Sequence, residues 1–233
     1  MNENIYIKTL EIAGFAPALQ AMRLPMKSGD KSDSCLGFLE PDDYHGCNHQ
    51  GEYDLTYYEK QIRISKKDLK LAQNLVRSGD EQGKVMRGVM VWFEINAPRY
   101  FHVELDTYSV GATRLSSESS MHVECKGLGG DELVRAKENL KESHLQKRIW
   151  VMSYQTLRRI YFQRKDHRLP LWREVFVPWI ETLPLAKELI TVNPWYIDEI
   201  ERLKNRVETL ENELYDWEDE GASISGDYME DEW

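Results

Sequence analysis

A serine cluster at residues 116–120 encloses a glutamate, and a histidine follows at position 122. Hydroxyl groups and an imidazole can bind phosphate oxygens or the polar edge of a pyrimidine, and a carboxylate can act as an acceptor or a base. Glu118, Ser119, Ser120 and His122 are therefore candidate nucleotide-binding residues. Serine-rich segments more often form only a turn or a helix cap, and this simpler interpretation stays open.

Basic residues gather between positions 147 and 173 and face a single acid, Asp166. Guanidinium groups bind phosphate oxygens through two parallel hydrogen bonds. We single out Arg164 and Arg168 as candidate nucleotide-binding residues, because they flank His167 where a predicted helix ends. The alternative is a solvated helix face with salt bridges. The whole basic set is Lys147, Arg148, Arg158, Arg159, Arg164, Lys165, Arg168 and Arg173.

Neither a metal site nor a familiar catalytic motif is predicted. Cys35, His45, Cys47 and His49 share one polar loop, but they lack the paired C-x₂-C unit of zinc sites. The sequence has no G-x-S-x-G segment, and "GLGGDE" at 127–132 lacks the Lys and Ser/Thr of a phosphate-binding loop. The catalytic residues, if the chain has any, are unknown from the sequence.

The composition indicates a soluble globular protein with a distinct C-terminal end. The chain has 233 residues, 41% of them hydrophobic, and no apolar run long enough to cross a bilayer. Three cysteines and no signal peptide favour reduced thiols and a cytoplasmic location. Eleven acids and no Lys or Arg follow residue 207, leaving 30 basic and 29 acidic residues before it. A near-neutral body therefore carries an acidic end.

Alternating strands and helices must position these candidates. Hydrophobic patterns predict strands at 4–15 and 84–97 and helices at 16–26, 65–79, 130–146, 150–164 and 169–190, the last broken near Pro178 and Pro184. Ser65 is the expected cap of the second helix. The segment "INAPRYFHVEL" reads as a strand that leads through Ala97 and Pro98 into a helix. A long surface loop is expected from Lys27 to Tyr53.

The segment 193–218 has the clearest periodicity in the chain. Ile200, Val207 and Leu214 fall at heptad positions a, and Leu203, Leu210 and Trp217 fall at d. We expect a coiled-coil helix that associates as a parallel homo-oligomer, with Arg206 at g facing Glu211 at e. The alternative is a helix that packs on its own domain. Residues 219–233 form an acidic tail, and residues 1–192 form the main α/β domain.

Taken in order, these segments resemble the flavin-dependent thymidylate synthases, and more closely a set of divergent phage-type relatives. The resemblance rests on "ALQAMR" at 18–23, "SGDEQGKVMRGVMVWFEINAP" at 78–98, "SSESSMH" at 116–122 and "LRRIYFQRKDHRLPLWREVFVPWI" at 157–180. It implies an α+β fold, a mixed sheet with flanking helices like the thymidylate-synthase-complementing core. It also implies a pyrimidine nucleotide, FAD and a methyltransferase reaction, with Arg164 at the nucleotide-contacting position and Glu174 near the acidic position of the last helix.

The departures from that family lie where its ligands bind. Its Arg-His-Arg signature is replaced by Thr107, Tyr108 and Ser109, and its Ser-x-Arg ends here in His122. Its paired histidines are also absent, with residues 79–81 (Gly-Asp-Glu) in their place. Each lost charge-assisted contact costs on the order of 1.5 to 3 kcal/mol. The resemblance therefore predicts the fold more firmly than the reaction.

Two functions follow as hypotheses. The first is a nucleotide-binding protein or modified enzyme, with Arg164 beside the hydroxyls near residue 120. The second is a non-catalytic phage protein in the host cytoplasm, which binds a host or defence protein through the coiled coil and acidic tail. Nucleic-acid binding through the basic set is a third hypothesis, which the isoelectric point near 5.2 opposes.

Overall fold

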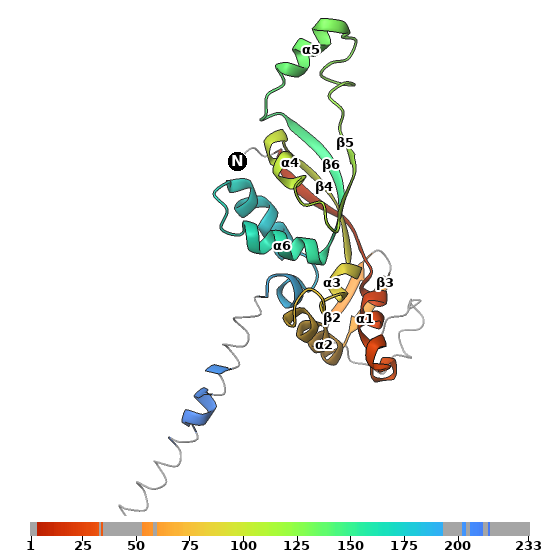
Figure 1. Cartoon of the computed structure of the whole chain (residues 1–233), viewed down its shortest axis with the longest axis vertical. Coiled ribbons are helices and arrows are strands. Elements are labelled where there is room, and N and C mark those ends of the chain that lie inside the picture. The colour runs from red at the N-terminus through yellow and green to blue at the C-terminus, as the bar shows by residue number, and fades with distance from the viewer. Residues whose placement is uncertain are drawn as a thin grey trace, which may run out of the picture. The chain divides into compact units, whose positions relative to one another are not determined.

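The computed structural model in Figure 1 describes residues 4–32, 34, 53–57, 60–192, 202–203, 206–211 and 214. Contacts divide the chain into two units, Met1–Thr191 and Val192–Trp233. The first unit combines helices with a four-stranded antiparallel sheet, which confirms the predicted α+β class. Among the described residues, no helix combines the length and apolar character that crossing a bilayer requires.

The sheet has the strand order β1-β4-β6-β5, with β1 Tyr6–Ala13, β4 Met90–Pro98, β6 Leu145–Ser153 and β5 Ala112–Ser117. Residues paired across neighbouring strands share a face of the sheet. Phe93 pairs with Trp150, and both are buried, whereas Glu94 pairs with Ile149 on the opposite face. One face is thus apolar and must be covered.

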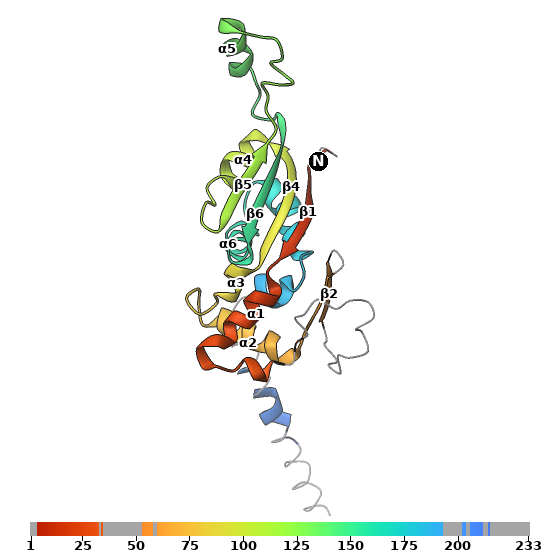
Figure 2. The same cartoon turned by 90° about the vertical axis from the view of Figure 1, so that its right-hand side faces the viewer.

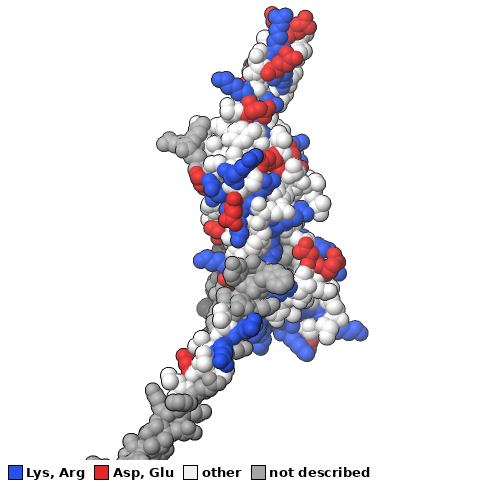
Figure 3. Space-filling model, turned by 60° about the vertical axis from the view of Figure 1, so that its left-hand side comes forward, with Lys and Arg blue, Asp and Glu red and all other residues white. Residues whose placement is uncertain are grey.

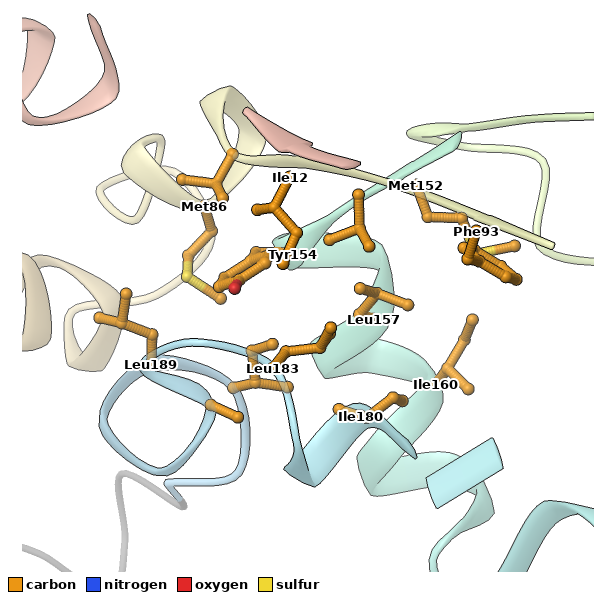
Figure 4. Close-up of a cluster of buried hydrophobic side chains, with 14 of the residues drawn as sticks. Ile12, Met86, Phe93, Met152, Tyr154, Leu157, Ile160, Ile180, Leu183 and Leu189 are labelled. Atoms are coloured by element: carbon orange, nitrogen blue, oxygen red, sulfur yellow. The ribbon is translucent and has the colours of Figure 1, made fainter. Parts of the chain in front are cut away.

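Helical segments from the second half of the unit cover that apolar face. They are α6 (Tyr154–Arg164), the π-helical turns η4 (Trp172–Phe176) and η5 (Ala186–Ile190), and α7 (Val177–Glu181). Figure 4 shows Leu157 and Ile160 of α6 in one cluster with Phe93 and Met152 of the sheet. Each such buried side chain contributes about 1.5 to 3 kcal/mol of hydrophobic free energy. Figure 2 looks onto the opposite face of the sheet.

Three further helices pack together at one end of the sheet: α1 (Phe15–Arg23), α2 (Lys66–Arg77) and α3 (Val85–Gly88). The Ser65 hydroxyl accepts a hydrogen bond from the Asp68 amide, as predicted for the cap of α2. Gly14 joins β1 to α1 at φ 98°, where a Cβ would lie 1.9 Å from the carbonyl oxygen of Gly88. Only glycine therefore permits this approach.

The connections carry shorter elements. The turns η1 (Leu24–Met26) and η2 (Gly29–Lys31) follow α1, and β2 (Tyr53–Tyr57) pairs antiparallel with β3 (Lys60–Ile64). Helix α4 (Arg99–Leu105) continues β4, as the Ala97–Pro98 signal predicted. Between β5 and β6 the chain forms an arm with α5 (Gly130–Glu138), which extends beyond the end of the sheet in both views.

Several predicted boundaries are wrong. Residues 150–153 belong to β6 and not to a helix, because Trp150, Val151 and Met152 are buried within the sheet before Ser153 caps α6. The predicted strand at 84–97 begins with the helical turn α3, and the helix predicted at 130–146 ends at Glu138. The polypeptide stays helical through Pro178, because a π-helical turn precedes it and Pro178 lies in the first turn of α7.

Some predictions concern segments beyond the described residues. They are the Cys35, His45, Cys47 and His49 loop, the heptad positions Ile200 and Trp217, and the acidic tail at 219–233. Within the described ranges, no group of three His, Cys, Asp or Glu side chains could hold a metal ion.

Candidate functional site

A polar hollow of about 280 Å³ lies between α6 and the segment that follows α4. Residues 107–110 form one wall, and Arg159, Gln163 and Arg164 of α6 form the other. Arg159 and Gln163 are four residues apart, a spacing that places two side chains on one face of a helix. The Thr156 hydroxyl donates a hydrogen bond to the Val110 carbonyl (2.7 Å), which fixes the segment against α6.

Arg164 is held from several sides. Its Nε donates to the Tyr108 hydroxyl (2.8 Å) and its Nη1 to His167 Nε2 (2.7 Å), with Glu104 Oε2 at 3.3 Å from Nη1. The guanidinium also lies 4.8 Å from the centre of the Trp172 ring, a cation–π arrangement. Its side chain is only 18% exposed. Among the described residues, Arg164 Nη2 has no hydrogen-bond partner.

Of the other groups in this hollow, Tyr108 is firmly held, whereas Arg159 and Ser109 are less constrained. The Tyr108 ring is buried, and its hydroxyl donates to Gln163 Oε1 (2.9 Å). Arg159 is exposed; its Nη2 donates one long hydrogen bond to the Val110 carbonyl (3.3 Å), and its guanidinium lies 5.9 Å from the centre of the Tyr108 ring. The Ser109 hydroxyl makes no hydrogen bond within the described part of the chain. Two guanidinium groups, one hydroxyl and the Gln163 amide thus retain donors that could meet an anion.

A second hollow, of about 350 Å³, lies at the uncovered face of the sheet. Here acids stand beside bases: the Glu118 carboxylate accepts a hydrogen bond from the Lys147 amide (2.9 Å) and lies 4.0 Å from Lys147 Nζ. Arg148 pairs with buried Ile95 across the sheet, and its guanidinium is bonded to Asp106, which follows α4 (2.9 Å). Tyr6 donates to Glu94 (2.7 Å), and this hydrogen bond to a carboxylate raises the pKa of Tyr6. The lining residues are Glu94, Ser116, Ser117, Glu118, Lys147, Arg148 and Ile149.

Ser116 and Ser117 end strand β5, and the residues after Glu118 form a turn, in line with the simpler interpretation. The Ser119 hydroxyl accepts from the Met121 amide (3.2 Å), the Ser120 hydroxyl contacts Lys137, and the His122 amide donates to the Ser119 carbonyl (3.2 Å). Arg164 lines the hollow beside α6, whereas Glu118 lines the one on the sheet face. No hydrogen bond or ion pair among the described residues joins Arg164 or Arg168 to residues 118–122.

The basic set is divided among different tasks rather than forming one helix face. Lys147 and Arg148 lie on β6, and Arg158 donates to the carbonyls of Leu189 and Ile190 (2.9 Å each). Burial lowers the pKa of Arg158. Arg168 is exposed and makes no hydrogen bond or ion pair with any described residue. On the face shown in Figure 3, Lys and Arg are interspersed with Asp and Glu.

The residues beside α6 do not fit FAD. The hollow, about 280 Å³, is near the lower limit of the roughly 300 to 1,000 Å³ of sites for drug-sized ligands, and a dinucleotide is larger than most such ligands. Thr107, Tyr108 and Ser109 bring no charge, and the Thr107 hydroxyl already donates to the Glu104 carbonyl (2.7 Å). The free donors suit one phosphate group.

Sequence reasoning found Arg164 but missed its surroundings. Tyr108 and Ser109 were read only as replacements for charged residues, and Arg159 was one of eight basic residues without a separate role. The i, i+4 pair of Arg159 and Gln163 was the one local signal available.

The sequence matches no family model and no curated protein. Solved structures do match: a flavin-dependent thymidylate synthase ThyX from Helicobacter pylori complexed with FAD and dUMP has 14% identity and a TM-score of 0.56, covering 80% of this chain and 98% of that chain. A second structure of that enzyme with FAD and dUMP gives 14% and 0.57, covering 80% and 97%. A UMP/dUMP methylase, PolB from Streptomyces cacaoi, bound with 5-Br dUMP is more distant, at 12% and 0.47, covering 78% and 90%. The chain therefore has the fold of the flavin-dependent thymidylate synthases, at low sequence identity.

Proposed function

We propose that this protein binds a pyrimidine nucleotide and holds its phosphate in the hollow beside α6. The observation that carries the proposal is the pair of guanidinium groups, Arg159 and Arg164, on one wall of a polar hollow. The pyrimidine class comes from the fold, since the similar ThyX structures were solved with dUMP. No catalytic residue is assigned.

The contacts support different tasks for the two arginines. Arg164 is oriented by Tyr108, His167 and Trp172, so its unpartnered Nη2 is preorganised and little rotamer entropy is lost on binding. Arg159 is exposed and can move toward a phosphate as it binds. The Ser109 hydroxyl and Gln163 amide supply neutral donors. The turn at residues 118–122 takes no part in this proposal.

Calorimetric titration of the full chain with dUMP and dTMP tests the proposal. Removing one charge-assisted phosphate contact costs about 1.5 to 3 kcal/mol, so Arg159→Ala should weaken binding roughly 10- to 100-fold. Arg168→Ala is the matched control, because it removes the same charge near the same helix end but outside the hollow. Its affinity should stay within about twofold of wild type.

Two results would contradict the proposal. One is the absence of binding heat for both nucleotides with the wild-type chain. The other is an equal loss of affinity in both variants, which would indicate general charge attraction rather than a site.

FAD is tested separately by the absorbance spectrum of the purified protein. Because the hollow does not fit a dinucleotide, we expect no flavin band and no change in the spectrum when FAD is added. A bound flavin that dUMP displaces would show that FAD does occupy this hollow.

A further inference from the structure

An apolar stripe runs along the helical residues of the second unit. Residues 202–203, 206–211 and 214 are helical, and Leu203, Val207, Leu210 and Leu214 are 54%, 52%, 46% and 62% exposed. Their spacing of four, three and four residues places them on one side of a helix. Within the second unit, the described residues therefore leave the heptad seam uncovered.

We propose that this seam binds the same seam of a second copy of the chain, as a parallel two-stranded coiled coil. Val207 and Leu214 take a positions and Leu203 and Leu210 take d positions. A β-branched residue at a with leucine at d favours two parallel strands. The occupant is thus a helix with the identical pattern, which this chain itself supplies.

Charges beside the seam select the second copy and its direction. Arg206 stands at g and Glu211 at the following e, and both are exposed. In a parallel, in-register pair each g residue faces the e residue of the next heptad on the other helix, so Arg206 meets Glu211 of the second copy twice. In an antiparallel pair, g residues face g residues and e residues face e residues. An antiparallel pair centred on this segment would therefore bring the two Arg206 side chains together and the two Glu211 side chains together. The parallel homodimer is complementary.

Mass measurement of the full chain across a concentration series tests the seam. We expect self-association in the wild type and a lower mass for the Leu203→Asp/Leu210→Asp double variant, with a dissociation constant raised by more than about 100-fold. Val134→Asp is the control, because Val134 is also exposed (53%) but lies on α5 of the first unit. Its mass should match wild type.

Charge reversal tests the direction. Arg206→Glu or Glu211→Arg alone places like charges opposite each other and should weaken the dimer roughly tenfold. An equimolar mixture of the two single variants should recover the affinity, because both contacts between positions 206 and 211 then join opposite charges. Affinity for dUMP should not change in either variant, so failure here is distinguishable from failure of the proposed function.

A monomeric wild-type chain at 100 µM protein would overturn the proposal, as would a mass that the double aspartate variant leaves unchanged. An association that depends on the leucines but not on charge reversal would overturn the parallel arrangement.

Discussion

The structure has two polar hollows of similar size, one beside α6 and one on the uncovered face of the sheet, and they differ in how their charges are satisfied. Beside α6, Arg164 contacts the Tyr108 and Trp172 rings and keeps Nη2 without a described partner, while Arg159 has one long hydrogen bond and a distant cation–π contact with Tyr108. On the uncovered face, the Glu118 carboxylate accepts from the Lys147 amide and lies 4.0 Å from Lys147 Nζ. The first hollow has donors to spare, whereas the second is already neutralised.

This difference teaches that the number of basic residues does not locate an anion site. Lys147 lines its hollow with two acids, Glu94 and Glu118, which would repel a phosphate. The described residues that line the hollow beside α6 include no acid, and Glu104, which contacts Arg164, is shared with the Trp172 indole (2.8 Å). A phosphate there meets net positive charge.

The largest expected effect comes from removing the support under Arg164. Trp172 is fully buried and contacts Phe101 and Phe176, so Trp172→Ala should lower the free energy of unfolding by about 3 to 5 kcal/mol. Urea denaturation measures it. Trp172→Phe keeps most of the packing and loses the hydrogen bond to Glu104, which should cost about 1 kcal/mol. An equal loss in free energy of unfolding for Trp172→Ala and Trp172→Phe would show that packing of an aromatic ring at position 172 is not what stabilises this region.

A smaller effect concerns α4, which leads into the hollow beside α6 and also contacts β6. His102 is buried, its Nε2 lies 2.7 Å from the Gln146 carbonyl, and burial lowers its pKa to about 4. The unfolded chain takes up this proton near pH 6.5, so stability is full above that pH and is lost as pH falls toward 4. Between pH 7 and 5 the loss should be on the order of 2 kcal/mol.

His102→Gln is the variant that checks this pH dependence, because it removes the titrating group. Urea unfolding at pH 7 and pH 5 should show a smaller loss of stability in the variant than in wild type. The same loss of stability in wild type and variant would mean that a group other than His102 causes the pH dependence.

The smallest expected effect sharpens the contrast between the hollows. Lys147 is exposed and lines the hollow on the sheet face, so Lys147→Ala should change dUMP affinity by less than about twofold. The calorimetric titration used for Arg159→Ala measures it. A loss as large as that of Arg159→Ala would place the nucleotide on the sheet face instead.

Local signals predicted much of the fold. The apolar pattern that predicted a strand at 4–15, the Ser65 cap of α2 and the Ala97–Pro98 step from β4 into α4 act within a few residues, and the structure confirms all three. The start of α6 was wrong because the apolar run 149–152 suits a buried strand and a buried helix equally well. Only pairing with β4 and β5 decides between them.

The site was less predictable, because its contacts are remote in sequence. Tyr108 meets Gln163 and Arg164 across 55 and 56 residues, and no local pattern announces such pairs. The serine cluster was singled out by composition, yet the Ser119 hydroxyl accepts from the Met121 amide within its own turn and the Ser120 hydroxyl contacts Lys137 of α5. Arg164 was singled out by its place beside His167 in the basic set and by the family resemblance, whereas its neighbours could be identified only from the fold.

The most direct test of the central claim is a crystal structure of the full chain grown with dUMP. We predict phosphate oxygens within hydrogen-bond distance of the Arg159 and Arg164 guanidinium groups, with the Ser109 hydroxyl as a further donor. Nucleotide bound instead beside Glu118 and Lys147, or a hollow beside α6 that stays empty at saturating dUMP, would contradict it.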